Sequence, residues 1–174
     1  ALISEFVKKK DTIFFTGVLM DVKIINPFLS STLNLFTHMF SIDAQAGEPY
    51  LLGDELKHRW EISGILGLTG DYQGLVGFRL PRLLADKMLE RSGIETKTEE
   101  ERQETVYGMI GEMTNIIAGN ASSAIDHASI DISPPVVIFG ENHRIAWPKT
   151  MPVIAIPFSS PSGPFEVDVC FKKK

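Results

Sequence analysis

The chain has 174 residues, which is enough for one domain with a sizeable core or at most two small domains. Hydrophobic residues make up 44% and charged residues 22% of the chain, as in an ordinary soluble globular protein, and the formal net charge is −5. This charge argues against a nucleic-acid partner, because phosphate binding needs a concentrated basic surface. The two basic runs, residues 8–10 and 172–174, are expected to be a solvated turn and a solvated tail.

The single cysteine, Cys170, excludes an internal disulfide and favours a reducing compartment. No apolar run approaches the roughly 18 residues of a membrane-spanning helix. Residues 1–20 also lack the basic start and the long apolar segment of a secretory signal. We therefore expect a cytoplasmic protein.

The first half of the chain predicts one helix and a hairpin. Residues 12–20 are compatible with a strand but give no clear pattern. Asn26 as a cap and Pro27 in the first turn predict a helix start, and apolar residues recur at helical spacing from there to Phe40. Residues 60–68 and 74–80 predict two strands joined by a turn at 69–73, and their four glycines indicate close packing of the backbone, for example against a helix.

Two more helices and three strands are predicted in the second half. Pro81 opens a helix that Ser92 and Gly93 end. Thr98 is a good cap for the next helix, because three glutamates follow it in the first turn, and that helix is expected to run to about residue 128. Strands are predicted at 130–139, 152–158 and 165–171, the first of them at a sheet edge because two prolines interrupt it.

Strands in hairpins, with helices grouped between them, predict an α+β fold with helices packed on a largely antiparallel sheet. A weak echo relates residues 26–80 to residues 98–171, since each stretch runs from a helix into strands. This echo is consistent with an internal pseudo-twofold.

The most informative stretch is the predicted helix at 108–120, which keeps three glycines in its interior. Each interior glycine costs roughly 1 kcal/mol against alanine, so we expect another backbone or a partner to come close to this helix. Glu112 and Asn115 are three residues apart and therefore share a helical face, which also carries Gly108 and Gly119 and points away from the apolar stripe. Alone, Glu-x-x-Asn is a very short pattern, typical of any solvated helix face.

A wider set of residues resembles a known family. Residues 110–121, followed by residues 130–136 with Pro134 and Pro135, resemble the CheC/CheX/FliY family of bacterial chemotaxis phosphatases, and CheX most closely. That pattern is Glu-x-x-Asn on a long helix and a proline-bearing strand about twenty residues later. The hairpin at 64–78 also resembles the central sheet of the family. The likeness implies one CheX-like phosphatase domain over residues 22–174, with residues 1–21 an N-terminal extension of unclear role.

The chain also departs from the family pattern. Gly108 stands where many CheC-type members carry Asp or Ser. CheC repeats the motif on its first helix, and the matching place here, residues 31–34, has Ser31 where glutamate is expected and Asn34 at its end. One site rather than two fits CheX, and it leaves room for a member that binds without catalysing.

The resemblance implies a phosphatase that acts on the aspartyl phosphate of a CheY-like response regulator. Asn115 is then the catalytic residue that orients the hydrolytic water, and Glu112 docks on the active-site lysine of the partner. The prolines shape the strand beside the helix. The protein needs no cofactor of its own, Mg²⁺ belongs to the partner, and a homodimer is expected.

Two alternatives remain at this point. The first is a non-catalytic CheX-like module that binds or titrates a receiver domain. The second is an unrelated hydrolase or metalloprotein, for which the sequence offers little. The four histidines lack metal-ligand spacing, no glycine-rich phosphate loop precedes a helix, and residues 160–163 predict a turn rather than a nucleophile elbow; the histidines are His38, His58, His127 and His143.

Overall fold

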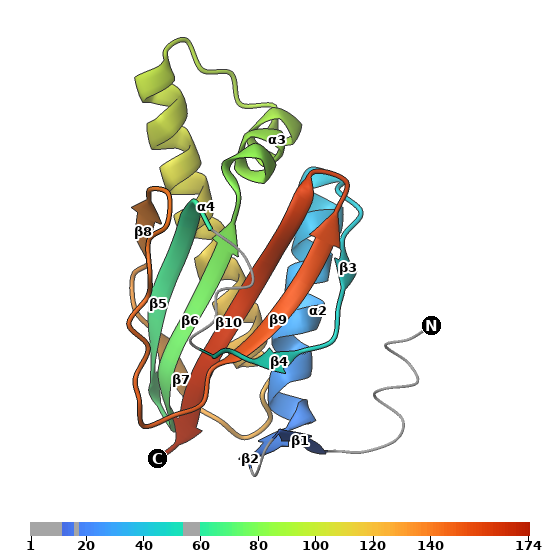
Figure 1. Ribbon diagram of the computed structural model, residues 1–174, viewed down its shortest axis with the longest axis vertical. Coiled ribbons are helices and arrows are strands. Elements are labelled where there is room, and N and C mark those ends of the chain that lie inside the picture. The colour runs from blue at the N-terminus through green and yellow to red at the C-terminus, as the bar shows by residue number, and fades with distance from the viewer. Residues whose placement is uncertain (1–11, 16–17, 54–59) are drawn as a thin grey trace.

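The computed structural model describes residues 12–15, 18–53 and 60–174, so the basic run at 8–10 and His58 lie outside the described residues. Helices α2 (Val22–Phe40) and α4 (Glu99–Ser123) run antiparallel behind one face of a sheet, and α3 (Arg82–Ser92) packs near the start of α4 (Figure 1). The eight strands of the sheet pair antiparallel throughout. The predicted α+β class is confirmed.

The sheet strands are β3 (Gln45–Ala46), β4 (Tyr50–Leu51), β5 (Ile62–Gly70), β6 (Tyr72–Leu80), β7 (Ile130–Ile132), β8 (Val136–Phe139), β9 (Ile154–Ser160) and β10 (Gly163–Lys173). A separate hairpin, β1 (Thr12–Phe15) and β2 (Val18–Asp21), precedes α2 and accounts for the stretch that the sequence left open. The short strands β3 and β4 were not predicted. The basic run at the C-terminus begins inside β10 instead of forming a free tail.

The strand order contains an internal repeat. It reads β3-β9-β10-β6-β5-β7, with β4 also beside β9 and β8 also beside β5. The order is unchanged when the hairpin β5–β6 is exchanged with β9–β10 and the short pair β3 and β4 with β7 and β8. Each half thus consists of a helix, two short edge strands and a long hairpin. This connectivity has the pseudo-twofold that the sequence echo predicted.

The core lies between the helices and the sheet and is rich in stacked aromatic rings. Phe36 of α2 stacks on Phe165 of β10 with ring centroids 4.1 Å apart, and Phe165 stacks on Phe158 of β9 at 4.9 Å. Phe78 of β6 meets Phe36 edge to face. Stacked and edge-to-face pairs add to the stabilisation from apolar burial, so these rings fix α2 on the central strands.

The helix boundaries confirm some predictions and correct others. Pro81 and Gly93, the latter with φ of +74°, flank α3 as expected. Helix α2 begins four residues before Asn26, and Pro27 lies inside it, where it gives no main-chain hydrogen bond to the preceding turn. Burial of Ile25 on the same face as Phe28 explains the extra turn, because it extends the apolar stripe.

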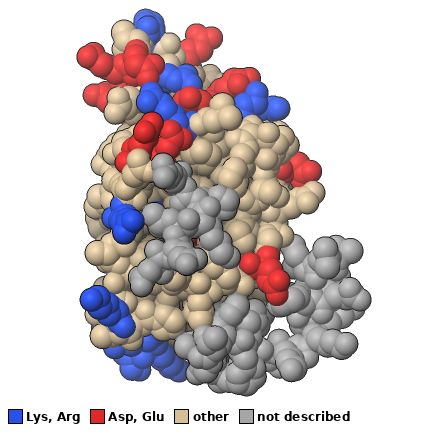
Figure 2. All heavy atoms as spheres, in the orientation of Figure 1, with Lys and Arg blue, Asp and Glu red and all other residues tan. Residues whose placement is uncertain are grey.

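Charge gathers at one end of the molecule. Figure 2 shows acidic and basic side chains together over α3 and the start of α4, while the rest of the visible described surface carries few charges. Two ion pairs join these helices, Arg82–Glu99 at 2.6 Å and Asp86–Arg102 at 2.8 Å. All four side chains are at least a third exposed, so we attribute little stability to either pair. Among the described residues, no helix has the length and apolar character needed to cross a bilayer.

Candidate functional site

Helix α4 carries the candidate site, and its start is capped as predicted. The Thr98 side chain accepts a hydrogen bond from the Glu101 amide at 3.1 Å, and the Glu101 carboxylate accepts one from the Lys97 amide at 2.8 Å. The three glutamates of the first turn lie at the positive end of the helix dipole. The helix ends at Ser123, five residues before the predicted boundary. His127, with φ of +58°, has already left the helical conformation.

The inner face of α4 is held very close to the sheet. Met113 and Ile117 are buried on this face, while Met109 is half-buried against the core. The Thr114 hydroxyl is also buried and donates to the Ile110 carbonyl at 2.7 Å. Gly64 of β5 lies directly beneath it, and a Cβ at Gly64 would overlap the Thr114 hydroxyl. The predicted packing of this strand against a helix is therefore confirmed.

The outer face of α4 presents Glu112 and Asn115 one turn apart. Glu112 is exposed, as expected, whereas Asn115 is half-buried rather than fully exposed. Within the described part of the chain, neither side chain makes a hydrogen bond or an ion pair. The Asn115 amide therefore keeps its donor and acceptor capacity for solvent or for another molecule.

Glycines occupy the positions around Asn115. Gly111 and Gly119 lie one turn before and one turn after it on the same row of the helix, and Gly108 precedes Glu112 by one turn. Side chains at i and i±4 are the ones that normally flank a helical residue. Because these positions lack side chains, no helical neighbour at i±4 covers the Asn115 amide, and none at i−4 covers the Glu112 carboxylate.

Part of the predicted close approach comes from the protein itself. A Cβ at Gly111 would lie 3.5 Å from both Pro135 and Val137, and a Cβ at Gly119 would lie 3.7 Å from Ile132. The edge strands β7 and β8 thus pack along this side of α4. Only Gly108 has open space around it among the three helical glycines. The expected close approach is thus made by the protein's own edge strands at Gly111 and Gly119, and Gly108 remains open to a partner.

The place on α2 that the sequence matched to this pair does not reproduce it. Ser31 is buried, with 7% of its surface exposed, where Glu112 is exposed. Thr32 donates to the carbonyl four residues earlier at 2.7 Å, as Thr114 does on α4. If these two threonines are equivalent, Leu33 rather than Asn34 corresponds to Asn115. Of these two helices, α4 carries a Glu/Asn pair and α2 does not.

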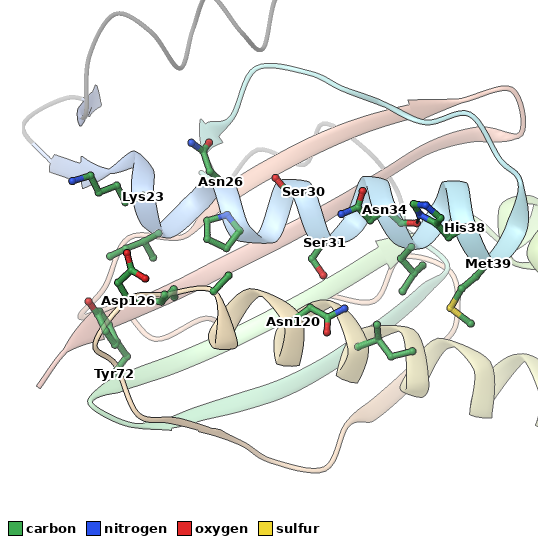
Figure 3. A pocket seen from close by; sticks show the side chains of 16 residues that line it. Lys23, Asn26, Ser30, Ser31, Asn34, His38, Met39, Tyr72, Asn120 and Asp126 are labelled. Atoms are coloured by element: carbon green, nitrogen blue, oxygen red, sulfur yellow. Dashed lines mark hydrogen bonds between the residues drawn. The ribbon is translucent and has the colours of Figure 1, made fainter.

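A groove of about 970 Å³ runs between α2 and the C-terminal half of α4. Ser31 projects from α2 toward α4 and Asn120 from α4 toward α2, while Asn34 and His38 lie along the α2 side (Figure 3). Ile116, four residues after Glu112, also lines it. The groove therefore borders the face that carries the Glu112/Asn115 pair, on the side opposite β7 and β8.

The other candidate residues do not assemble a site. His38 and His127 are exposed, and His143 is half-buried and bonded to Ser63 at 2.7 Å. Cys170 is buried, and burial raises the pKa of its thiol, which is the behaviour of a core cysteine. No group of three potential metal ligands occurs among residues 23–53 and 60–174. Residues 160–163 form the predicted turn between β9 and β10.

A buried polar network on the opposite face of the sheet was not predicted. Arg79 of β6 contacts Asp168 of β10 at 3.3 Å and donates to the Ser63 hydroxyl at 3.3 Å, while Tyr50 donates to Glu166. Burial and the neighbouring Glu166 raise the pKa of the Asp168 carboxyl well above its usual range, although Arg79 opposes the shift. Charged residues alternate with apolar ones along β10, but the sequence does not show that the charged face is covered.

Comparison with known proteins agrees with this architecture. The family model described as chemotaxis phosphatase CheX matches residues 62–159. Among solved structures, a CheC-like superfamily protein from Shewanella sp. PV-4 is 30% identical, with 88% of this chain and 99% of that chain covered and a TM-score of 0.79. A chemotaxis protein CheX from Desulfovibrio desulfuricans is 27% identical, with 86% and 99% covered and a TM-score of 0.77.

A third solved structure contains a partner. It is a CheX–CheY–BeF3–Mg²⁺ complex from Borrelia burgdorferi, 28% identical, with 86% of this chain and 98% of that chain covered and a TM-score of 0.74. The chain matches no curated protein sequence.

Proposed function

Because the chain belongs to the chemotaxis phosphatase CheX family, we propose that it dephosphorylates the aspartyl phosphate of a CheY-like response regulator. The observation that carries the proposal is the isolated pair on α4, in which an exposed carboxylate and a half-buried carboxamide stand one turn apart between glycines. The solved CheX–CheY complex supports a receiver domain as the partner.

Asn115 is the proposed catalytic residue. A receiver domain supplies Mg²⁺ and a lysine around its phosphoryl group, so hydrolysis needs mainly a water molecule held in line with the bond that breaks. The carboxamide oxygen of Asn115 accepts a hydrogen bond from that water, and its NH₂ group donates to a phosphoryl oxygen. Since the amide is uncharged, it does not repel the phosphate as a carboxylate would.

Glu112 is the proposed docking residue. Its carboxylate is exposed and has no ion-pair partner among the described residues, so it is free to meet the active-site lysine of the receiver. A charge-assisted hydrogen bond of this kind orients the helix as well as adding affinity. The adjoining open surface at Gly108 lets the backbone of α4 approach the partner closely.

The remaining parts of the proposal follow from the partner. Mg²⁺ belongs to the receiver and not to this chain, and both proteins act in the cytoplasm. Residues 22–174 form the phosphatase domain, which works as a homodimer, and residues 1–21 lie outside it. Analytical ultracentrifugation of the purified chain tests the dimer, because a monomer at working concentrations contradicts it.

The direct test measures binding and turnover side by side. Purified protein is added to phosphorylated receiver domains from the same cell, and both the lifetime of the phosphoryl group and complex formation are followed. We expect a shorter lifetime for at least one receiver. Binding with an unchanged lifetime identifies the non-catalytic alternative, and the absence of both effects contradicts the family-based proposal.

Glu112→Ala tests the docking role. Loss of a charge-assisted bond worth about 1.5–3 kcal/mol is expected to raise the receiver concentration for half-maximal rate by about tenfold or more, with a smaller change in the rate at saturation. Glu104→Ala is the matched control, because Glu104 is an exposed glutamate two turns earlier on the same helix. Equal effects of the two substitutions contradict a specific role for Glu112.

A further inference from the structure

The edge strand beside α4 contains a bulge. β7 pairs with β5 up to Leu68–Ile132, and β8 resumes the pairing at Ile65–Val136. Residues 133–135 therefore face only two residues of β5, so the edge strand carries one extra residue. Bulges bend a strand locally and recur beside active sites, where they redirect a side chain or a neighbouring element.

The bulge lies at the level of Asn115. Gly111, one turn before Asn115, faces Pro135, and Gly119, one turn after it, faces Ile132. The three bulge residues connect these two contact points, and Asn115 lies midway between them on the helix. The width of the seam between α4 and the edge strand at Asn115 thus depends on where the bulge holds Pro135.

Ser133 fixes the bulge to the sheet. Its amide donates to the Gly67 carbonyl at 2.9 Å, and its hydroxyl accepts from the Gly67 amide at 2.8 Å. The same hydroxyl donates to the Pro134 carbonyl at 3.2 Å. The Ser133 hydroxyl therefore accepts the hydrogen bond from the Gly67 amide that a main-chain carbonyl accepts in a regular strand pair. The same hydroxyl links Gly67 to Pro134, the first of the two prolines.

The composition of the bulge also prevents its backbone from forming a hydrogen bond to the Asn115 side-chain amide. Pro134 and Pro135 have no main-chain N–H, so neither can donate to the oxygen of Asn115. An ordinary strand at this position offers such donors, and a donor captured by the amide oxygen competes with the water that the proposed reaction needs.

We infer that Ser133 is a positioning residue for Asn115. Its hydroxyl anchors the bulge, whose prolines offer no N–H donor, and the bulge in turn sets the width of the seam between α4 and the edge strand in which the Asn115 amide lies. This inference rests on the proposed function. Ser133 does not touch the reacting groups, and it acts through Pro135 and the helix at Gly111. The test therefore includes readouts that a loss of fold stability alone does not produce.

Kinetics on three variants test the inference. Ser133→Ala is expected to lower the saturating rate of receiver dephosphorylation by about tenfold, since a small misplacement of a positioning group costs that much or more. The receiver concentration for half-maximal rate is expected to change by less than about twofold. Ser133→Thr keeps the hydroxyl and is expected to restore most of the rate, because β-branched residues suit a strand edge.

Ser160→Ala is the matched control. Ser160 also donates to a carbonyl, that of Gly163 at 2.8 Å, and accepts from an amide, that of Ser162 at 3.2 Å, but in the β9–β10 turn. It is expected to leave the rate unchanged. A Ser133→Ala variant that is as fast as wild type, or a Ser133→Thr variant as slow as Ser133→Ala, overturns the inference.

A second readout does not depend on activity. The side-chain NH₂ resonances of Asn115 in ¹⁵N-labelled protein, assigned by their loss in Asn115→Ala, are expected to shift in Ser133→Ala and not in Ser160→Ala. Unshifted resonances overturn the positioning role even when the wild type is active. If the wild type shortens no receiver lifetime while the resonances shift, the proposed function fails and the coupling of Ser133 to Asn115 stands.

Discussion

Replacing Gly64 with alanine probes the contact that sets the height of α4 above the sheet. The added Cβ would overlap the Thr114 hydroxyl and would lie 3.1 Å from Thr114 Cβ and 3.3 Å from Ile110 Cγ2. Rotating the hydroxyl away breaks its bond to the Ile110 carbonyl but leaves both carbon contacts tight. Overpacking of a core costs about 1–3 kcal/mol and a lost hydrogen bond about 1 kcal/mol, so we expect a loss of about 2–4 kcal/mol in the free energy of unfolding.

Urea unfolding of Gly64→Ala, Thr114→Ala and the double variant provides the measurement. Removing the Thr114 hydroxyl relieves the overlap, so Gly64→Ala should cost at least about 1 kcal/mol less in the Thr114→Ala background. Gly108→Ala is the control, because its Cβ meets open space and should stabilise the helix by about 1 kcal/mol. A Gly64→Ala variant within about 0.5 kcal/mol of wild type, or costs that simply add, would refute this account of the packing.

Two further predictions concern the helix cap and the buried network. Thr98→Ala should lower the free energy of unfolding by about 1 kcal/mol, measured by urea unfolding, because it removes the acceptor for the Glu101 amide; an unchanged value contradicts the role of the cap. The pKa of the Asp168 carboxyl is raised in the folded state, whereas in the unfolded state it is about 4. Between these two pKa values the folded state binds more protons than the unfolded state, so the free energy of unfolding falls as pH rises. Asp168→Asn should remove this component, and a difference between wild type and variant that does not change with pH contradicts it.

Local signals predicted much of the fold. Pro81, Gly93 and Thr98 mark helix ends through their own backbone and capping chemistry, and each lies where the sequence placed it. The hairpin of β5 and β6 could also be predicted, because alternating apolar residues lie on both sides of a turn. In the structure, the last paired residues before that turn are Leu68 and Gly74. Such features depend on residues close together in the chain.

Features that depend on distant contacts were missed. Pro27 lies inside α2 because burial of Ile25 extends the helix, which a local capping signal cannot show. Asn115 is half-buried, and the edge strand that follows about twenty residues later packs along α4 at Gly111 and Gly119, one turn to either side of it. For the same reason, a helical glycine pattern did not distinguish Gly111, which meets this strand, from Gly108, which faces open space.

The buried network illustrates the same limit on the other face of the sheet. Glu166 and Asp168 alternate with apolar residues, which ordinarily predicts a solvated strand face. Both are buried, and residues distant in the chain lie on this face: Tyr50 bonds to Glu166, His143 bonds to Ser63, and Trp147 lies over Gly77. In contrast, the Glu112/Asn115 pair was predicted from sequence only because a known family pattern singled out two residues that composition alone does not.

The most direct test of the proposed mechanism is the lifetime of a phosphorylated receiver domain in the presence of wild type, Asn115→Ala and Asn120→Ala. Asn120 is the control, because it is an exposed amide on the same helix that lines the groove beside α2. We predict that Asn115→Ala folds normally and loses acceleration by about 100-fold at saturating receiver, as is typical when one group that orients or stabilises the reacting atoms is removed. Asn120→Ala should keep the wild-type rate. An Asn115→Ala protein that still shortens the lifetime as wild type does would contradict the account.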